Sequence, residues 1–387
     1  MTFKLLKIFC LCLLLLSCEK KEEQKSAPKE ETPAVKLEKA SFKNLKGWKK
    51  DNLQDAITAF KKSCEKINSS STEYLGNAEV KIKTSDYAEL CRKLNTVQPK
   101  DYRKYFENNF TPWLVTYNGT PQGKFTSYYE SELHASYQKS DKYKYPVYGR
   151  PNDLIEVNLQ EFDPSLPAKR LIGRIEKQKL VPYFTRDEIN NQDLNAPVIL
   201  WSDNYVDIYV MQIQGSAVAT LDDGSKIRIG YAENNGRDFK GIGSILLEQG
   251  LIKPGQASMG HIKKWLKENF DQALVPMNKN HRYVFHRLLD SDGPIGAQGV
   301  SLTAGRSLAV DKTFIPLGSL LWLETTGPDK EKINKLVVAQ DIGGAIKGAV
   351  RGDYFWGSGG DDILEKAGRM HAAGQYYILL PKNAEVK

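Results

Sequence analysis

The residues that could do chemistry gather near the carboxyl end of the chain. Asp341 stands shortly before a Gly-Gly pair, and Asp353 is followed by Tyr354, Phe355 and Trp356. Glycine lets a sugar ring or another backbone come close, while aromatic neighbours desolvate a carboxyl group and raise its pKa. A carboxylic acid with a raised pKa can act as a general acid near neutral pH. The segment predicts a general acid beside aromatic faces that can stack on sugars, although a turn aspartate packed against core aromatics would produce the same pattern.

The sequence lacks the common motifs of nucleotide-binding proteins, metalloenzymes and serine hydrolases. It contains no Gly-rich phosphate loop, no metal-binding histidine pair with a partner glutamate, and no Gly-x-Ser-x-Gly turn. His281 and His286 lie five residues apart without such a partner, so we expect structural or surface roles for them. The sequence predicts neither a metal ion nor a cofactor.

The composition is that of a soluble globular protein with a modest positive charge. The formal net charge is +8 over 387 residues, of which 41% are hydrophobic and 26% charged. Such a balance suits an anionic partner, or it reflects lysine and glutamate alternating on solvated faces. No Lys/Arg patch interleaved with aromatics occurs, so we do not expect nucleic acid as a partner.

The first residues resemble a targeting signal. Two lysines precede a short apolar run, which ends in Leu15-Leu16-Ser17-Cys18 and resembles a bacterial lipobox. We expect residues 1–17 to be a lipoprotein signal peptide, Cys18 to carry the lipid, and residues 18–40 to be a flexible polar tether. A plain signal peptide with an incidental cysteine is the alternative. In many Gram-negative lipoproteins, an aspartate after the lipidated cysteine signals retention in the inner membrane. Because Glu19 stands there instead, we expect the protein to be anchored at the periplasmic side of the outer membrane.

Two helices should follow the tether. Apolar positions from Leu53 to Ile67 have helical spacing, and a second helix is expected after Ser85 as its N-cap. Cys64 and Cys91 then lie on buried faces of adjacent helices. They either bridge in an oxidising periplasm or remain two buried thiols.

The remainder of the chain reads mainly as strands. Residues 207–213 form a β-rich run, residues 222–224 form a hairpin turn, and Ser258 caps a helix. Short strands return at 320–323, 336–339 and 376–380, with glycine turns between them. The length suggests two domains, and the fold class is mainly β with flanking helices, including a barrel.

Several motifs in order resemble the membrane-bound lytic murein transglycosylase A family. Three aspartates, Asp311, Asp341 and Asp353, match its C-terminal three-aspartate region, and the resemblance covers roughly residues 41–382. The other matching segments are residues 125–130, 145–148, 182–189, 212–216 and 231–236. Ser127 and Ser131 depart from the family's Gly and Pro, which puts local groove contacts in doubt.

The resemblance implies a discontinuous fold. A double-psi β-barrel domain with N-terminal helices would comprise residues 41–127 and 284–387. An inserted all-β domain would comprise residues 128–283, and a groove between the two domains would hold a glycan strand.

The resemblance also implies a reaction, namely cleavage of the β-1,4 bond between N-acetylmuramic acid and N-acetylglucosamine in peptidoglycan by an exotransglycosylase. Asp353 would act as acid and then as base while the C6 hydroxyl closes a 1,6-anhydro ring. Asp341 would stabilise the transition state, and Asp311 would support a barrel loop. Candidate sugar-binding residues are Thr126, Tyr128, Gln214, Ser216, Asn235 and Lys347.

The expected partners are glycan strands of peptidoglycan and the membrane that holds the lipid anchor, with the protein a monomer that wall-synthesis complexes could recruit. Two alternatives stay open at this point. One is a hydrolase on the same barrel, with Asp341 as the base for water. The other is a lipoprotein that binds the wall without cleaving it.

Overall fold

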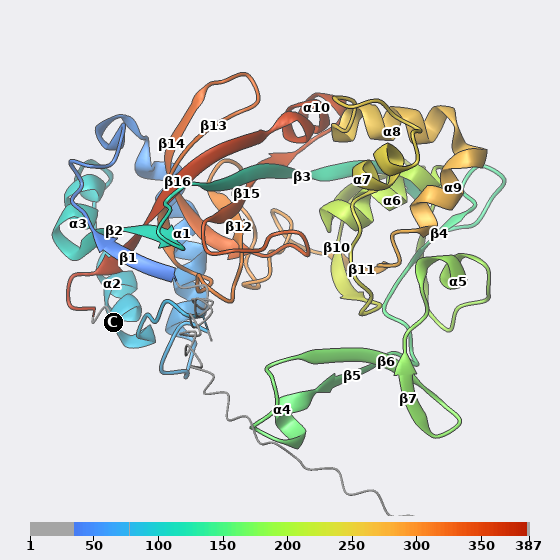
Figure 1. Cartoon of the computed structure of the whole chain (residues 1–387), viewed down its shortest axis with the longest axis horizontal. Helices are drawn as coiled ribbons and strands as arrows, with labels where there is room; N and C mark the ends of the chain where they lie inside the picture. Colours follow the sequence, from blue (N-terminus) through green and yellow to red (C-terminus); the bar gives the residue numbers. More distant parts are fainter. Residues whose placement is uncertain (1–34, 77, 385–387) are drawn as a thin grey trace, which may run out of the picture. The chain divides into compact units, whose positions relative to one another are not determined.

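The computed structural model describes residues 35–76 and 78–384 (Figure 1). The signal peptide, Cys18 and most of the predicted tether lie outside these residues. Among the described residues, no helix is both long and apolar enough to cross a membrane.

A thirteen-stranded sheet forms the framework, in the order β1-β2-β16-β13-β14-β12-β15-β3-β9-β10-β11; off this path, β8 pairs with β3 and β4 pairs with β8. Its strands in chain order are β1 Val35–Lys39, β2 Phe110–Tyr117, β3 Gly123–Ser136, β4 Tyr145–Tyr148, β8 Val198–Ser202, β9 Ala217–Leu221, β10 Lys226–Asn234, β11 Val284–Leu289, β12 Ser307–Val310, β13 Leu320–Thr326, β14 Lys332–Asp341, β15 Arg351–Ser358 and β16 His371–Pro381.

Part of this sheet closes on itself. The strands β3, β16, β13, β14, β12 and β15 pair in a ring, because β3 bonds to β15 on one side and to β16 on the other. All four residues of β12 are buried, as are Leu320–Leu323 of β13, so the ring encloses a packed core. The predicted barrel strands and mainly β fold class are confirmed. The double-psi connectivity and the domain boundaries remain predictions.

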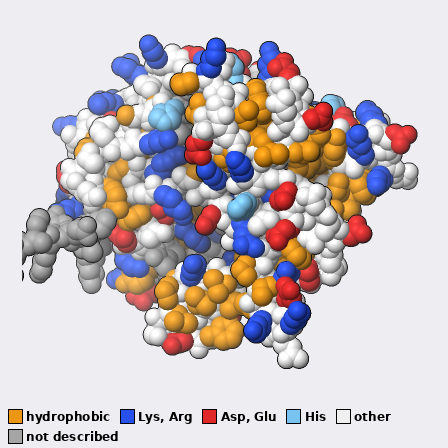
Figure 2. All heavy atoms as spheres, turned by 45° about the vertical axis from the view of Figure 1, so that its right-hand side comes forward, with side chains coloured by type: hydrophobic (Ala, Val, Ile, Leu, Met, Phe, Trp, Pro, Cys, Tyr) orange, Lys and Arg blue, Asp and Glu red, His pale blue; other side chains and the backbone are white. Residues whose placement is uncertain are grey.

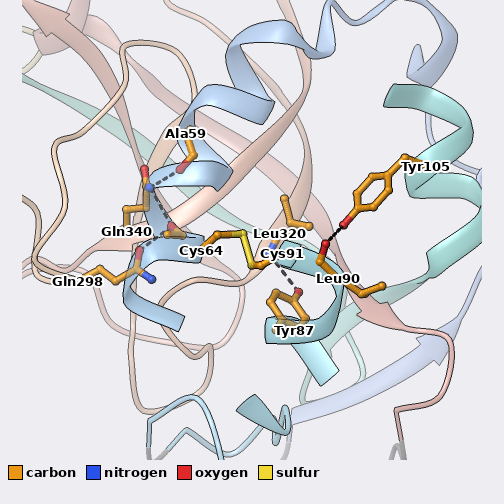
Figure 3. The surroundings of a disulfide bond; sticks show 10 residues. Ala59, Cys64, Tyr87, Leu90, Cys91, Tyr105, Gln298, Leu320 and Gln340 are labelled. Atoms are coloured by element: carbon orange, nitrogen blue, oxygen red, sulfur yellow. Dashed lines mark hydrogen bonds between the residues drawn. A yellow bond between two sulfur atoms is a disulfide. The ribbon is translucent and has the colours of Figure 1, made fainter. Parts of the chain in front are cut away.

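Helices cover the barrel. They are α1 Leu53–Asn68, α2 Thr84–Leu94 and α3 Tyr102–Asn109, with α10 Asp361–Arg369 between β15 and β16. The apolar face predicted for α1 is buried, and a disulfide joins Cys64 to Cys91 (Figure 3). The predicted start of α2 after Ser85 is wrong: Lys83 is the N-cap. Lys83 pairs with Tyr74 in an isolated β-bridge, so the chain stays extended up to the residue before Thr84.

The segment between β3 and β11 contains helices as well as strands. They are α4 Leu159–Phe162, α5 Arg186–Asn190, α6 Tyr205–Gln214, α7 Ile242–Glu248, α8 Met259–Glu268 and α9 Phe270–Asn278. The predicted all-β character of the insertion is therefore wrong. Ser258 does cap α8, and β9 and β10 do form a hairpin.

Residues 207–213, predicted as a strand, belong to α6. The Asn204 side chain accepts hydrogen bonds from the backbone amides of Val206 and Asp207, and Gly215 ends the helix with a φ of 94°. Most of α6 is buried, so apolar residues occur on nearly all of its sides and form a continuous run in the sequence instead of a periodic pattern. Such a run does not distinguish a buried helix from a buried strand.

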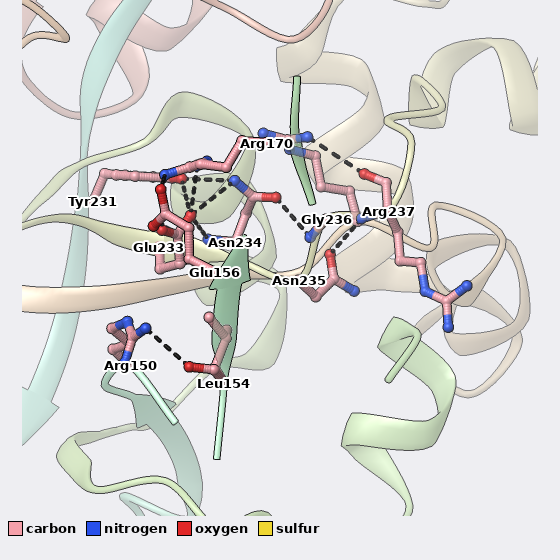
Figure 4. Close-up of polar contacts among 11 residues, drawn as sticks. Arg150, Leu154, Glu156, Arg170, Tyr231, Glu233, Asn234, Asn235, Gly236 and Arg237 are labelled. Atoms are coloured by element: carbon pink, nitrogen blue, oxygen red, sulfur yellow. Dashed lines mark hydrogen bonds and ion pairs between the residues drawn. The ribbon is translucent and has the colours of Figure 1, made fainter. Parts of the chain in front are cut away.

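A separate three-stranded sheet contains β5 Ile155–Asn158, β6 Arg170–Glu176 and β7 Lys179–Pro182. Arg170 of β6 links the small sheet to the larger one by an ion pair to Glu233 of β10 at 3.0 Å. It also forms an ion pair with Glu156 of β5, within the small sheet, at 3.2 Å (Figure 4). Its other face carries exposed apolar side chains, including Ile175 and Leu180. Figure 2 shows hydrophobic side chains gathered at the lower edge of the molecule, where Figure 1 places this small sheet.

Candidate active site

Strand pairing brings the two candidate aspartates to the same level. Asp341, the last residue of β14, lies opposite Ala309 of β12, and Asp353 of β15 lies opposite the same alanine from the other side. Two strand spacings, roughly 10 Å in a flat sheet, separate their backbones. On the far side of β15, the parallel strand β3 places Thr126 opposite Asp353 and Tyr128 opposite Phe355.

Asp353 is half-buried and receives a hydrogen bond from the Thr126 hydroxyl at Oδ1. Arg351 donates from Nη2 to the same Thr126 oxygen at 2.7 Å. Burial raises the pKa of Asp353, while the Thr126 hydrogen bond and the charges of Arg351 and Lys124 act to lower it. The aromatic neighbours Tyr354 and Phe355 are buried, as the sequence suggested. The carboxyl group thus has the raised pKa that a general acid needs.

Asp341 is more heavily hydrogen-bonded. Tyr128 donates its hydroxyl to Oδ2 at 2.8 Å, and the backbone amides of Ala297 and Ile342 donate to Oδ1, each at 2.9 Å. The pKa of Asp341 is raised to about 6: burial raises it most, the three hydrogen bonds act to lower it, and the negative charge of Asp353 also raises it. Two carboxyl groups that influence one another can divide acid and stabilising roles between them.

The loop that supplies the Ala297 amide rests on helix α1. Gln340, fully buried next to Asp341, donates from Nε2 to the Ala59 carbonyl and to Ser63 Oγ, both at 2.9 Å (Figure 3). Ser63 donates in turn to Gln298 Oε1 at 2.7 Å. Since Ser63 precedes the disulfide residue Cys64, the disulfide-linked helices support the surroundings of Asp341.

Asp311 and Lys347 lie on the loops around the site. The Asp311 carboxylate is buried and accepts from the amides of Thr313 at 3.1 Å and Gly348 at 2.9 Å. These contacts favour a role in holding the loop that contains Lys347. The Lys347 side chain itself is exposed.

The other sequence-predicted residues fall into two groups. Gln214 and Ser216 adjoin β3: Gln214 Oε1 accepts from the Tyr129 amide at 3.2 Å, and the Ser216 carbonyl accepts from Ser131. Asn235, in contrast, is fully buried, and its side-chain amide is occupied by the backbone of Phe184, His281 and Tyr283. We therefore withdraw Asn235 from the candidate sugar-binding residues.

The two serines that depart from the family pattern have contacts of their own. Ser127 accepts from the Trp356 indole at 2.8 Å and donates to the Ala367 carbonyl at 2.9 Å. Ser131 is buried and donates to the Ser216 carbonyl at 3.1 Å. Both substitutions are thus accommodated by hydrogen bonds.

Sequence reasoning missed two groups at the site. Arg351 could have been found, because residues two apart on a strand share a face and Asp353 is two positions later. The Ala297 amide could not, since it contacts Asp341 from a loop 44 positions earlier in the chain. The predicted structural or surface roles fit the histidines: His286 is buried, which lowers its pKa to about 3, and His281 is exposed.

Comparison with other proteins places this geometry in a family. Residues 124–287 match the model of the MltA specific insert domain, and residues 306–380 match the 3D domain. A crystal structure of MltA from Neisseria gonorrhoeae is 30% identical, with 91% of this chain and 94% of that chain covered and a TM-score of 0.78. The chain belongs to the MltA family.

Two further relatives extend the MltA-family comparison. Membrane-bound lytic murein transglycosylase A of Escherichia coli K12 is 30% identical over 267 residues, which span 66% of this chain but only 65% of that protein's length. The crystal structure of Escherichia coli MltA with bound chitohexaose shares the fold at 21% identity and a TM-score of 0.59, covering 84% and 90% of the two chains.

Proposed function

We propose that this MltA-family protein is a lytic transglycosylase that cleaves the β-1,4 bond between N-acetylmuramic acid and N-acetylglucosamine in peptidoglycan. One observation carries the proposal: a half-buried carboxyl group of raised pKa, Asp353, sits opposite Thr126 in a chain related to proteins of that name. The bound chitohexaose of the Escherichia coli relative supports a glycan substrate.

Asp353 serves as the acid and then as the base. Its proton goes to the glycosidic oxygen as the bond to the sugar's C1 breaks, so that N-acetylglucosamine leaves. The resulting carboxylate takes the proton from the C6 hydroxyl of N-acetylmuramic acid as that oxygen bonds to C1. Because the nucleophile belongs to the substrate, no water and no second catalytic base is needed.

Asp341 stabilises the positive charge that develops on the sugar ring. For this role it must be ionised, and its three hydrogen-bond donors favour the ionised form. Tyr128 holds one of its oxygens and packs against Phe355, with ring centroids 5.1 Å apart. Gln214, Ser216 and Lys347 are the proposed sugar contacts beyond the reacting residue.

We infer the cellular setting from the first residues and the relatives' names. The membrane-bound relatives support a membrane-attached protein. We further propose that Cys18 carries a lipid and that this lipid anchors the protein at the periplasmic side of the outer membrane. In this proposal the protein is a monomer that cleaves glycan strands from their ends and is recruited by wall-synthesis complexes.

The mass of the released fragments tests the activity. The full-length protein in detergent is incubated with purified peptidoglycan, and the products are analysed by mass spectrometry. We expect muropeptides one water lighter than hydrolysis products, with an anhydro end. Reducing ends would indicate a hydrolase, and tight binding without fragments would indicate a wall-binding protein; either result contradicts the proposal.

The residue assignment has its own test. Asp353→Asn keeps the shape of the side chain but cannot donate an acid proton, so we expect binding to persist and cleavage to fall by roughly 10²–10⁴-fold. Asp238→Asn, at an exposed aspartate, is the matched control and should cleave like the wild type. Retained cleavage in Asp353→Asn would assign the acid to another residue.

A further inference from the structure

Arg351 is a buried cation that the proposed chemistry does not yet use. It lies on β15 two residues before Asp353, with only 9% of its surface exposed. Its Nη1 donates to the carbonyls of Lys124, at 3.2 Å, and Gly352, and its Nη2 donates to Thr126 Oγ1 at 2.7 Å. The guanidinium group is thus fixed by the backbones of both β3 and β15.

The direction of the hydrogen bonds follows from the chemistry of the groups. A guanidinium group stays protonated and can only donate, whereas a hydroxyl group has one proton and two lone pairs. With Arg351 donating to it, the Thr126 oxygen is an acceptor on that side. Its single proton is then left for Asp353 Oδ1, the acceptor it contacts.

This arrangement decides where Asp353 can carry a proton. A proton on Oδ1 would turn that oxygen into a hydroxyl, which accepts the Thr126 proton more weakly than an unprotonated carboxyl oxygen does. A proton on Oδ2 leaves both hydrogen bonds intact. No hydrogen bond of the described residues engages Oδ2, and Oδ2 is not among the fully buried side-chain atoms that lack a partner.

We propose that Arg351 is a positioning residue that orients the Thr126 hydroxyl and thereby directs the catalytic proton of Asp353 to Oδ2. The inference rests on the proposed function, because it assumes that Asp353 is the acid. It changes the role of Thr126 from a sugar contact to the intermediate member of an Arg–Thr–Asp chain.

The test compares Arg351→Met with the wild type, using the full-length protein in detergent and purified peptidoglycan. Without the guanidinium group, Thr126 can accept a proton from Oδ1, so fewer molecules hold the proton on Oδ2. We expect kcat to fall roughly 10- to 100-fold with KM within about 2-fold. Arg369→Met, at a half-exposed arginine on α10, is the matched control and should keep wild-type kcat.

The pH profile distinguishes positioning from loss of structure. Arg351, Lys124, Tyr128 and Asp341 are the ionisable groups that interact with Asp353. The charge of Arg351 lowers the pKa of Asp353, so its removal should move the alkaline limb of kcat to higher pH. A slower enzyme whose acid works to higher pH is not expected from a merely damaged fold.

Thr126 provides a second route that leaves Arg351 in place. Thr126→Val removes the hydroxyl and should reproduce both the lower kcat and the shifted limb, whereas Thr126→Ser should retain most of the wild-type rate. Suppose that the wild type releases anhydro products. If Arg351→Met then matches the wild type in rate and pH profile, or if Thr126→Ser is as slow as Thr126→Val, the inference about Arg351 is wrong and the proposed function stands. A wild type that releases no anhydro product overturns both.

Discussion

At the scale of single residues, Asp341 links activity to pH. Burial raises its pKa to about 6, and the proposed role requires its ionised form. We therefore expect the cleavage rate to rise as the pH increases through about 6 and to fall again as Asp353 loses its proton at higher pH. Initial rates on peptidoglycan between pH 4 and 9 measure both limbs. An acid limb that is unchanged in Asp341→Asn would contradict the assignment.

The same group has an effect on stability with a definite sign. A carboxyl group whose pKa is higher in the folded protein than in the unfolded chain, about 6 against 3.8, opposes folding once the pH exceeds both values. Asp341→Asn should then stabilise the protein at pH 7.5 by up to about 3 kcal/mol and have little effect at pH 3. Thermal melts at the two pH values test this, and equal shifts at both would refute it.

The sequence revealed those features of the site that depend on neighbouring residues, and not those that depend on contacts between distant strands. The aromatic residues after Asp353 predicted a raised pKa, and the structure agrees in direction. The Tyr128–Asp341 hydrogen bond joins residues 213 positions apart and depends on strand pairing. Asn235 was a candidate for sugar binding because it lies in a segment that matches the family, but its buried amide group is hydrogen-bonded to the backbone.

At the scale of elements, the disulfide joins α1 and α2 across 27 residues. Closing a loop of this length restricts the unfolded chain, so Cys64→Ser with Cys91→Ser should lower the free energy of unfolding by about 3–4 kcal/mol. Denaturant unfolding of the oxidised wild type and the double variant measures the loss. Because α1 supports the Ala297 loop through Ser63 and Gln298, cleavage should fall as well; an unchanged stability would argue against the bond.

Elements with a clear period or with turn residues at their ends were predictable, whereas the buried helix α6 was not. The half-buried α1 shows its face in the sequence, as does the β9–β10 hairpin through its turn. Helix α6 is buried on most sides, so its sequence lacks the alternation of apolar and polar residues that separates helix from strand. Short strands and glycine turns predicted a barrel, but not the pairing of β3 with β15 and β16, which lie more than 200 positions later in the chain.

At the scale of the whole molecule, Arg170 secures the small β5–β7 sheet to the rest of the body through Glu233. Arg170→Ala should increase hydrogen exchange in residues 155–182, while the barrel strands keep their protection, since Glu233 is the buried partner left without its ion pair. Lys169→Ala, at the exposed neighbouring cation, is the control. Exchange that rises uniformly across the chain would show global rather than local loosening.

The position of strand β3 in the chain determines when the barrel can close during synthesis. It leaves the ribosome early, yet its barrel neighbours β15 and β16 are translated more than 200 residues later. Until then the ring is open and β3 offers unpaired amides and carbonyls on both of its edges. The barrel cannot close before β15 and β16 have been synthesised, and during that interval the free edges of β3 can pair with strands of other chains.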